Sequence, residues 1–232
     1  MLFRQLFDPE TSTYTYLIAD TSSRVAVLVD PVLEQVERDL KLLQELGLKL
    51  LFGLETHIHA DHITGTGKLR EITGCQGVMP FGAKSVCADR LLSDGEVLSV
   101  GEVQIEAIAT PGHTDSHMAY LINKDRVLTG DALFIRGCGR TDFQGGDAGT
   151  LYESVTQRLF TLPEATLIYP GHDYKGQTVS TIAEEKQFNS RFAKRSCASF
   201  IKLMASLNLP DPKKIAEAVP ANQNCGKVSR TP

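Results

Sequence analysis

The sequence predicts an α/β fold in which β-strands and helices form layers. Apolar, β-branched segments alternate along the chain with segments in which leucine recurs at helical spacing. The chain has 232 residues, of which 42% are hydrophobic, which is enough to bury one sizeable core or a core with a small appendage. We therefore expect a single domain over residues 1–232 that includes a short helical C-terminal segment.

A hairpin, a helix and a strand open the predicted fold. Residues 14–20 and 25–30 are β-branched apolar runs separated by a turn-like segment of threonine and serine. Leucine and valine then recur at helical spacing over residues 33–46, and Gly47 ends that helix. Residues 50–55 predict a buried strand that ends directly before a cluster of histidines.

The alternation continues towards the C-terminus. A helix is predicted over residues 67–73, and a short strand follows near Val78. Further strands are predicted over residues 103–109, 117–122, 127–128 and 166–169, and a helix over residues 149–162. The residues after the last strand are expected to be mostly helical.

Charge, hydropathy and cysteine usage exclude several classes of protein. The net charge of −4 gives no basic surface for nucleic acid or an anionic membrane, and no apolar run approaches the roughly 18–20 residues that span a bilayer. The five cysteines are far apart and form no Cys-x-x-Cys pair, which argues against a disulfide framework or a structural zinc site. The first residues lack the apolar core of a signal peptide, so we expect a protein of the reducing cytoplasm.

Three histidines and an aspartate lie within six positions directly after the strand predicted at residues 50–55. They are His57, His59, Asp61 and His62, and they include half of the six histidines of the chain. His57 and His59 are two positions apart, so both side chains point to one side of an extended backbone. Nitrogen and oxygen ligands at the end of a strand suit a first-row transition metal.

Three further candidate ligands each follow a predicted strand and a glycine. They are His113 after Gly112, Asp131 after Gly130, and His172 after Gly171. Glycine allows the backbone to turn tightly, and loops at strand ends are where rigid scaffolds place reactive groups. The sequence therefore predicts that four loops bring these ligands to a metal centre. His117 lies in an apolar run and is interpreted as a structural histidine, and the cysteines as small buried residues.

The order and spacing of these seven candidate ligands resemble the metallo-β-lactamase superfamily. The match extends over essentially the whole chain. The resemblance implies a four-layered αββα sandwich with the metal at one edge. Because this fold hosts hydrolases, nucleases and oxidoreductases, membership alone leaves the reaction open.

Two subfamilies compete, and the sequence resembles the glutathione persulfide dioxygenases more closely than glyoxalase II. Residues 3–8, 12–17, 130–144, 171–174 and 219–222 carry this resemblance. The C-terminal part is also short for glyoxalase II, which has a longer helical extension that binds substrate. A dinuclear glyoxalase II-type hydrolase of acyl-glutathione thioesters remains the alternative. A non-enzymatic metal-binding scaffold would have lost ligands, and none is missing.

The dioxygenase resemblance implies one Fe(II) per chain, held by His57, His113 and Asp131. Two histidines and one carboxylate leave open positions for substrate and O₂. The other four candidate ligands then support the metal ligands or are remnants of a second metal site. They are His59, Asp61, His62 and His172. A count of ligands alone favours two zinc ions.

The resemblance also implies the substrates. Glutathione persulfide would react with O₂ and water to give sulfite and glutathione, whose carboxylates call for cationic and hydroxyl partners. Arg191 and Tyr174 match family positions for such contacts. Arg140 is a third candidate, although we expect it mainly to brace the loop after Asp131, with Asp142 as partner. Homodimers occur in the family, but no surface in the sequence identifies an interface.

Overall fold

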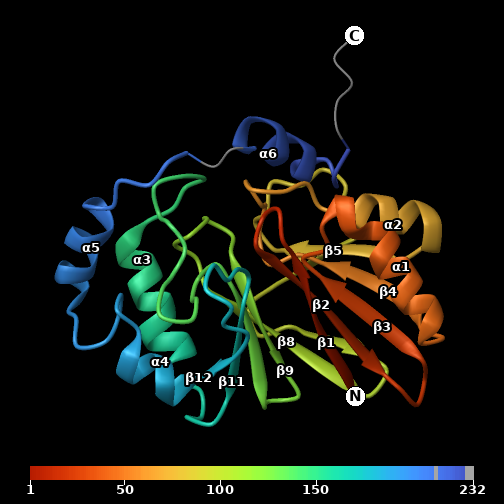
Figure 1. Cartoon of the computed structure of the whole chain (residues 1–232), viewed down its shortest axis with the longest axis horizontal. Coiled ribbons are helices and arrows are strands. Elements are labelled where there is room, and N and C mark those ends of the chain that lie inside the picture. The colour runs from red at the N-terminus through yellow and green to blue at the C-terminus, as the bar shows by residue number, and fades with distance from the viewer. Residues whose placement is uncertain (212–213, 228–232) are drawn as a thin grey trace. The chain divides into compact units, whose positions relative to one another are not determined.

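The computed structural model describes residues 1–211 and 214–227 (Figure 1). It contains two six-stranded sheets, each flanked by helices. The chain divides into two compact units: the first comprises residues 1–92 and 98–104 with the segment that begins at Asp211, and the second comprises residues 93–97 and 105–210. That all 232 residues form a single domain stays a prediction.

The sheet of the first unit has the strand order β1-β2-β3-β4-β5-β6. Its strands are β1 (Leu2–Asp8), β2 (Thr13–Asp20), β3 (Val25–Val29), β4 (Lys49–Leu54), β5 (Gln76–Pro80) and β6 (Arg90–Leu92). The first three are antiparallel neighbours, whereas β3 to β6 pair in parallel. Parallel neighbours need a crossover connection, which is supplied by η1 (Leu33–Gln35) with α1 (Val36–Glu45), and by α2 (Thr66–Thr73).

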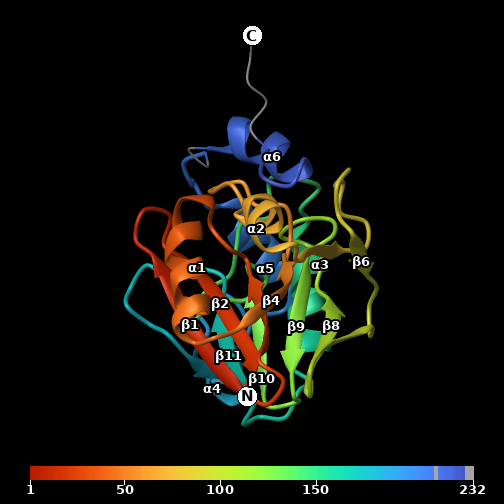
Figure 2. The same cartoon turned by 90° about the vertical axis from the view of Figure 1, so that its right-hand side faces the viewer.

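Both crossover helices of the first unit pack on the same face of its sheet (Figures 1 and 2). The helical spacing of leucine in α1 places its apolar side chains on one face, which is the face that meets the strands. The resulting core cluster comprises Leu17, Ala19, Ala26, Leu28, Val36, Leu43, Leu50, Leu69 and Cys75. Gly47, which follows the helix with a φ of +61°, ends it as the sequence predicts.

The first unit also contains the C-terminal helix α6 (Ile215–Gln223). In both views α6 lies beside α2 (Figures 1 and 2). The chain directly after α6 approaches the start of α2 so closely that a Cβ atom on Gly67 would lie 2.0 Å from the carbonyl oxygen of Cys225. Gly67 and Cys225, which are far apart in the sequence, therefore lie in direct contact.

The second sheet has the strand order β12-β11-β10-β9-β8-β7. Its strands are β7 (Val97–Val100), β8 (Val103–Ala109), β9 (Met118–Ile122), β10 (Arg126–Gly130), β11 (Leu167–Pro170) and β12 (Ser180–Thr181). Strands β10 and β11 are parallel, and β8–β9, β9–β10 and β11–β12 are antiparallel. The parallel connection again runs through a helix, α3 (Ala148–Glu153), which continues as the π-helical turn η2 (Ser154–Leu159).

Helices also cover one face of the strands in the second unit. The two that follow β12 are α4 (Ile182–Phe188) and α5 (Cys197–Ala205). Their apolar residues join those of α3 and η2 against the strands. The core cluster comprises Ile108, Ala119, Leu121, Val127, Ala132, Leu133, Leu151, Val155, Leu159, Ile168, Ile182, Phe192, Phe200 and Met204.

The predicted elements are confirmed, with small shifts at their ends. The helix predicted over residues 149–162 is α3 followed by η2. The strands that the sequence analysis missed are β1, β6, β7 and β12. β6 and β12 are only three and two residues long, too short for a periodic signal, and β1 pairs with β2 alone at the sheet edge.

The prediction that the cysteines form no disulfide is wrong for one pair. Cys87 and Cys225 are bonded, with Cα atoms 6.0 Å apart and 138 residues between them in the sequence. Because the fold brings these distant residues together, their spacing carries no signal of the bond. The expected reducing cytoplasm rested in part on cysteine usage and loses that part of its support. No helix in the described ranges is long and apolar enough to cross a membrane.

Candidate metal centre

The histidine-rich motif lies in a buried loop that leaves the end of β4 in the first unit. We call residues 55–66 the histidine loop. His57, His59 and His62 are almost inaccessible to solvent, and their rings are neighbours: the centroid distances are 4.1 Å from His57 to His59 and 4.3 Å from His59 to His62. The structure therefore gathers the three imidazoles of the motif into one cluster.

Asp30 holds the start of this loop from the end of β3. Its carboxylate accepts hydrogen bonds from the backbone N–H of Thr56 at 2.7 Å and from the Thr56 hydroxyl at 2.9 Å. The same hydroxyl lies 2.9 Å from Nδ1 of His57. The chain Asp30–Thr56–His57 thereby fixes the orientation of the His57 ring, as partners in the outer shell do for metal ligands.

His59 is held between two buried carboxylates. Its Nε2 lies 3.1 Å from Asp30 Oδ1 and 3.3 Å from Glu55 Oε2. Burial lowers the pKa of His59, but the charge of Asp30 and the hydrogen bonds to Asp30 and Glu55 raise it more, so the pKa lies well above its ordinary value. Glu55 in turn accepts hydrogen bonds from the hydroxyls of Thr64 and Thr66.

Two ring nitrogens of the histidine loop fit a metal ion. His59 Nδ1 and His62 Nε2 are buried and have no hydrogen-bond partner among the described residues. A buried imidazole nitrogen without a partner is costly, and a cation that binds there, in place of the proton at His59 Nδ1, removes that cost. His59, Asp61 and His62 each offer a ligand atom within 4.8 Å of the others. Asp61 is oriented by His62 Nδ1 at 3.0 Å and by the Thr13 hydroxyl at 3.2 Å.

The second unit brings its own three candidate ligands together around Asp131. His113 Nε2 lies 3.5 Å from Asp131 Oδ2, and His172 Nε2 lies 3.4 Å from Asp131 Oδ1. Two atoms that bind one ion at about 2.0–2.2 Å are roughly 3–3.5 Å apart. The spacing at Asp131 therefore suits ligands of a shared ion, and each carboxylate oxygen has one histidine as neighbour.

Hydrogen bonds orient these ligands. His113 Nδ1 lies 2.7 Å from the carbonyl oxygen of Arg140, so Nδ1 carries the proton and Nε2 keeps its lone pair for a metal. His117 Nε2 accepts a hydrogen bond from the backbone N–H of Asp131 at 3.0 Å, while its Nδ1 lies 2.8 Å from the Thr110 hydroxyl. The interpretation of His117 as a structural histidine is confirmed, and its role is to hold the backbone of Asp131.

Glycines allow the backbone to approach Asp131. Gly112 and Gly130 have φ values of +127° and +47°, which favour glycine. Gly171 is required for space instead, because a Cβ there would lie 2.6 Å from Asp131 Oδ1. Sequence analysis missed Gly139, where a Cβ would lie 2.8 Å from His113 Nδ1.

A buried carboxylate braces the segment after Asp131, residues 131–140, which we call the Asp131 loop. Glu185 of α4 accepts hydrogen bonds from the backbone N–H of Arg136 at 2.8 Å and from Asn189 Nδ2 at 2.9 Å, and it pairs with the Arg136 guanidinium. Asn189 Nδ2 also donates to the carbonyl oxygens of Phe134 and Gly137, both at 3.1 Å. No local sequence pattern marks Glu185 or Asn189, because their partners lie about 50 residues away.

The three candidate substrate-binding residues have different surroundings. Arg140 forms a bidentate pair with Asp142 at 2.6 and 2.8 Å and donates to the carbonyl oxygen of Pro210, which confirms the predicted partner. Tyr174 is 70% exposed, and its ring stacks on His172 with centroids 6.0 Å apart. Burial raises the pKa of the Cys138 thiol to about 12. Arg191 lies close enough for its positive charge to act in the opposite direction on this pKa.

Comparison with known proteins decides the family. The sequence profile of the metallo-beta-lactamase superfamily matches residues 8–80 and 88–172. The mitochondrial persulfide dioxygenase ETHE1 of Mus musculus is 53% identical over 230 residues, which cover 97% of this chain and 89% of the relative. The human protein of the same name is 52% identical over 235 residues, covering 100% and 91% of the two chains.

The chain belongs to the persulfide dioxygenase family of the metallo-β-lactamase superfamily. The crystal structure of ETHE1 from Myxococcus xanthus agrees with this assignment, with a TM-score of 0.96 and 56% identity over 98% of this chain and all of the other. The predicted metallo-β-lactamase fold is therefore confirmed. The persulfide dioxygenase relatives match along nearly the whole sequence, so the likeness extends well beyond the metal-binding motif.

Proposed function

We propose that this protein is a persulfide dioxygenase that oxidises glutathione persulfide with O₂ and water to sulfite and glutathione. The observation that carries the proposal is 52–53% identity to persulfide dioxygenases over 97–100% of the chain. The alternative, a thioester hydrolase of the glyoxalase II type, has less support from the comparisons. An oxygenase of this type needs a metal ion whose ligands leave open positions for substrate and O₂, so the candidate ligands must fit such an ion.

The proposed cofactor is one Fe(II) held by His57, His113 and Asp131. When bound, such an ion supplies the activation of O₂ next to a coordinated substrate. The spacing of 3.5 Å between His113 Nε2 and Asp131 Oδ2 supports a shared ion. The hydrogen bond between Thr56 and His57 supports a fixed orientation for the third ligand.

The residues around these ligands prepare them for the ion. His113 donates its Nδ1 proton to the backbone at Arg140, which selects the tautomer with the Nε2 lone pair directed to the ion. His117 holds the backbone of Asp131 from behind. These hydrogen bonds come from the protein itself and fix the orientation of the ligands, which is the general advantage of a pre-organised site.

The four remaining candidate ligands are proposed as supporting groups. His59 Nδ1 and His62 Nε2 lack hydrogen-bond partners among the described residues, which suits a second ion as well as a single one. Asp61 and His172 are already engaged, with His62 and Asp131 respectively. Iron and zinc contents per chain discriminate between the two arrangements.

Arg191 and Tyr174 are proposed to contact the glutathione part of the substrate. A guanidinium can bind a carboxylate through two parallel hydrogen bonds, and an exposed phenol supplies a further donor. Arg140 is assigned mainly to the brace of the Asp131 loop, because Asp142 and Pro210 occupy its guanidinium. The cytoplasmic location and a homodimer stay predictions that fractionation and light scattering can test.

Metal analysis with a paired assay tests the proposal. Protein purified without oxygen is expected to contain about one iron per chain and to consume O₂ when glutathione persulfide is added. Two zinc ions per chain with hydrolysis of lactoyl-glutathione would overturn it in favour of the hydrolase. An Arg191→Lys variant keeps the charge but loses bidentate geometry, so the KM for the persulfide should rise while iron content stays constant.

A further inference from the structure

The C-terminal helix α6 covers the histidine loop, and Asn222 makes the central contact. Its side chain is buried, and both its N–H donors and its oxygen bind the loop backbone. Asn222 Oδ1 accepts from the N–H of Thr64 at 2.8 Å, and Nδ2 donates to the carbonyl oxygens of His59 at 2.9 Å and His62 at 2.8 Å. One side chain thus holds the loop at three points, two of them at proposed metal-site histidines.

Apolar and backbone contacts surround this amide. Ile63 packs with Ala218 and Ala221 of α6, and Ile58 belongs to a second cluster that Val219 covers. Gly226, just after the helix, comes so near that a Cβ there would lie 2.2 Å from the carbonyl oxygen of Thr64. The histidine loop therefore relies on α6 for its packing as well as for its hydrogen bonds.

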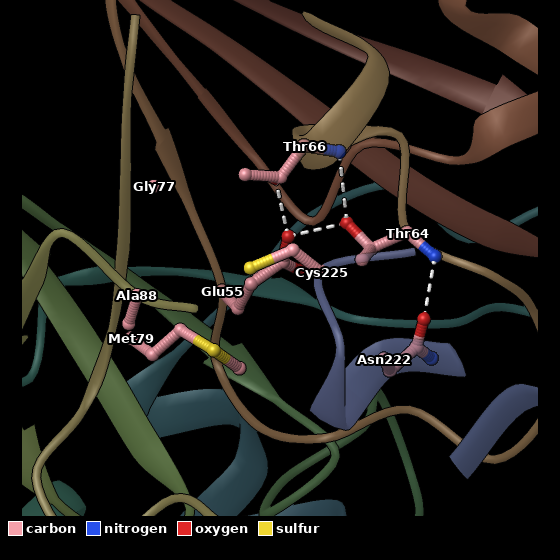
Figure 3. A pocket seen from close by; sticks show the side chains of 8 residues that line it. All are labelled: Glu55, Thr64, Thr66, Gly77, Met79, Ala88, Asn222 and Cys225. Atoms are coloured by element: carbon pink, nitrogen blue, oxygen red, sulfur yellow. Dashed lines mark hydrogen bonds between the residues drawn. The ribbon is translucent and has the colours of Figure 1, made fainter. Parts of the chain in front are cut away.

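The disulfide joins the end of this helix to the segment after β5. Cys225 lies three residues after Asn222 and is bonded to Cys87. The N–H of Val86 also donates to the carbonyl oxygen of Gln223 at 3.0 Å. Cys225 and Glu55 line one small pocket, together with Thr64, Thr66 and Asn222 (Figure 3). The covalent bond and the loop contacts are thus parts of one assembly.

We propose that the Cys87–Cys225 disulfide is a thiol-sensitive latch. While intact, it keeps α6 in place, so that Asn222 acts as a positioning residue for the histidine loop; once reduced, it lets the loop loosen and release metal more readily. The part of this inference that concerns metal rests on the proposed function. Glutathione, the thiol that the proposed reaction releases, belongs to the class of reductant that would open the latch.

The chemistry is thiol–disulfide exchange. A glutathione thiolate attacks Sγ of Cys87, which is half-buried, whereas Cys225 is buried. The Cys87–Cys225 bond breaks, and Cys225 leaves as a thiolate beside the Arg70 guanidinium, whose Nη1 lies 3.6 Å from its sulfur. A second glutathione thiolate then displaces Cys87 from the mixed disulfide. Two thiols are oxidised to glutathione disulfide, their protons pass to the two cysteines, and one protein disulfide is reduced.

The test is hydrogen exchange of the histidine loop in the full-length protein, with and without reduced glutathione. Alkylation followed by mass spectrometry first establishes whether Cys87 and Cys225 are bonded. Reduction is expected to speed amide exchange over residues 58–66 by about tenfold, because opening of the loop becomes easier. Transfer of bound iron to a chelator should accelerate in parallel.

Three variants separate the parts of the latch. Cys87→Ser should match the reduced wild type and no longer respond to glutathione, whereas Cys197→Ser, which removes a cysteine outside the disulfide, should behave as wild type. Asn222→Ala should exchange rapidly with its disulfide intact. Asn222→Asp, which keeps the acceptor for Thr64 but loses both donors, should lie between the two.

Two results would overturn the latch: both cysteines alkylated without prior reduction, or loop exchange that stays the same after reduction of the bond. The wild-type comparison needs no substitution, so a variant that fails to fold does not weaken it. Failure of the proposed function is distinguishable. In that case persulfide would cause no O₂ uptake, yet loop exchange would still respond to glutathione.

Discussion

The histidine loop and the Asp131 loop are both held by buried polar groups, but the two braces differ in kind. The histidine loop depends on Asn222, an uncharged side chain 160 residues away from His62, on a helix that a disulfide ties down. The Asp131 loop depends on Glu185, a buried carboxylate whose donors come from its own unit and are not covalently fixed. Each loop can therefore be perturbed by a change that leaves the other intact.

The largest expected effect comes from Asp131, the candidate ligand that His113 and His172 approach. Asp131→Ala should abolish iron retention and reduce persulfide-dependent O₂ uptake by about a thousandfold or more, since stabilisation by a metal is worth several kcal/mol. Iron content and oxygen consumption measure it. Asp142→Ala removes a nearby exposed carboxylate that pairs with Arg140, and it should keep its iron. Full activity in Asp131→Ala would contradict the proposed ligand set.

Removal of the charged brace should be the largest change in stability. Glu185→Ala leaves the Arg136 N–H and the Arg136 guanidinium without their buried acceptor and removes one of the three acceptors of Asn189 Nδ2, and we expect the free energy of unfolding to fall by about 3–5 kcal/mol. Urea denaturation measures this loss. The matched control is Glu184→Ala, because Glu184 pairs with the same arginine at the surface and should contribute no more than about 1 kcal/mol. Equal losses in the two variants would show that Glu185 is not the brace.

The motif residues could be predicted from the sequence because their signals are local. His57, His59, Asp61 and His62 are crowded into six positions, and Gly112 and Gly130 mark the tight turns before the next ligands. The signals for strands and helices are equally local, because the periodicity of apolar residues is visible within each segment. These features fixed the expected order of elements and the candidate ligands before any contact was known.

The braces could not be predicted in this way. Asn222 lies at the end of a helix with weak local signals, and its three partners are 158 to 163 residues away. The disulfide joins residues separated by 138 positions. Glu185 follows another glutamate in α4, and nothing in the local sequence tells which of the two is buried. Long-range contacts of this kind arise from the fold and leave no spacing pattern.

Loss of the disulfide should destabilise the brace of the histidine loop by an intermediate amount. Cys87→Ser is expected to lower the free energy of unfolding by about 2–4 kcal/mol, because the bond closes a long loop in the unfolded chain. Denaturation of oxidised wild type, reduced wild type and the variant measures the effect. The last two should coincide, and Cys197→Ser should resemble the oxidised wild type. A reduced protein as stable as the oxidised one would exclude a structural contribution from the bond.

The smallest expected effect is on the pH dependence of stability and concerns Asp39. Unlike Glu185, this buried carboxylate has few hydrogen-bond donors around it. Asp39 of α1 is bonded only to Arg38 at 2.8 Å, and its Oδ2 is buried without a hydrogen-bond partner in the part of the chain that the structure describes. Burial raises the pKa of Asp39 to about 6, against the opposing charge of Arg38. The native state therefore binds this proton more tightly than the unfolded chain, and stability falls as the pH rises from about 4 to 6.

Asp39→Asn removes the titration. At pH 7 to 8 the variant should be more stable than the wild type by about 1–3 kcal/mol, at 1.36 kcal/mol for each pKa unit, and the difference should vanish near pH 4. Thermal or urea unfolding across this range measures it. Parallel pH profiles for the two proteins would show that Asp39 does not carry the effect. Stabilities that coincide near pH 4 and separate at pH 7 to 8 would show that the buried Asp39 carboxylate destabilises the fold. This would contrast with Glu185, whose carboxylate is surrounded by hydrogen-bond donors.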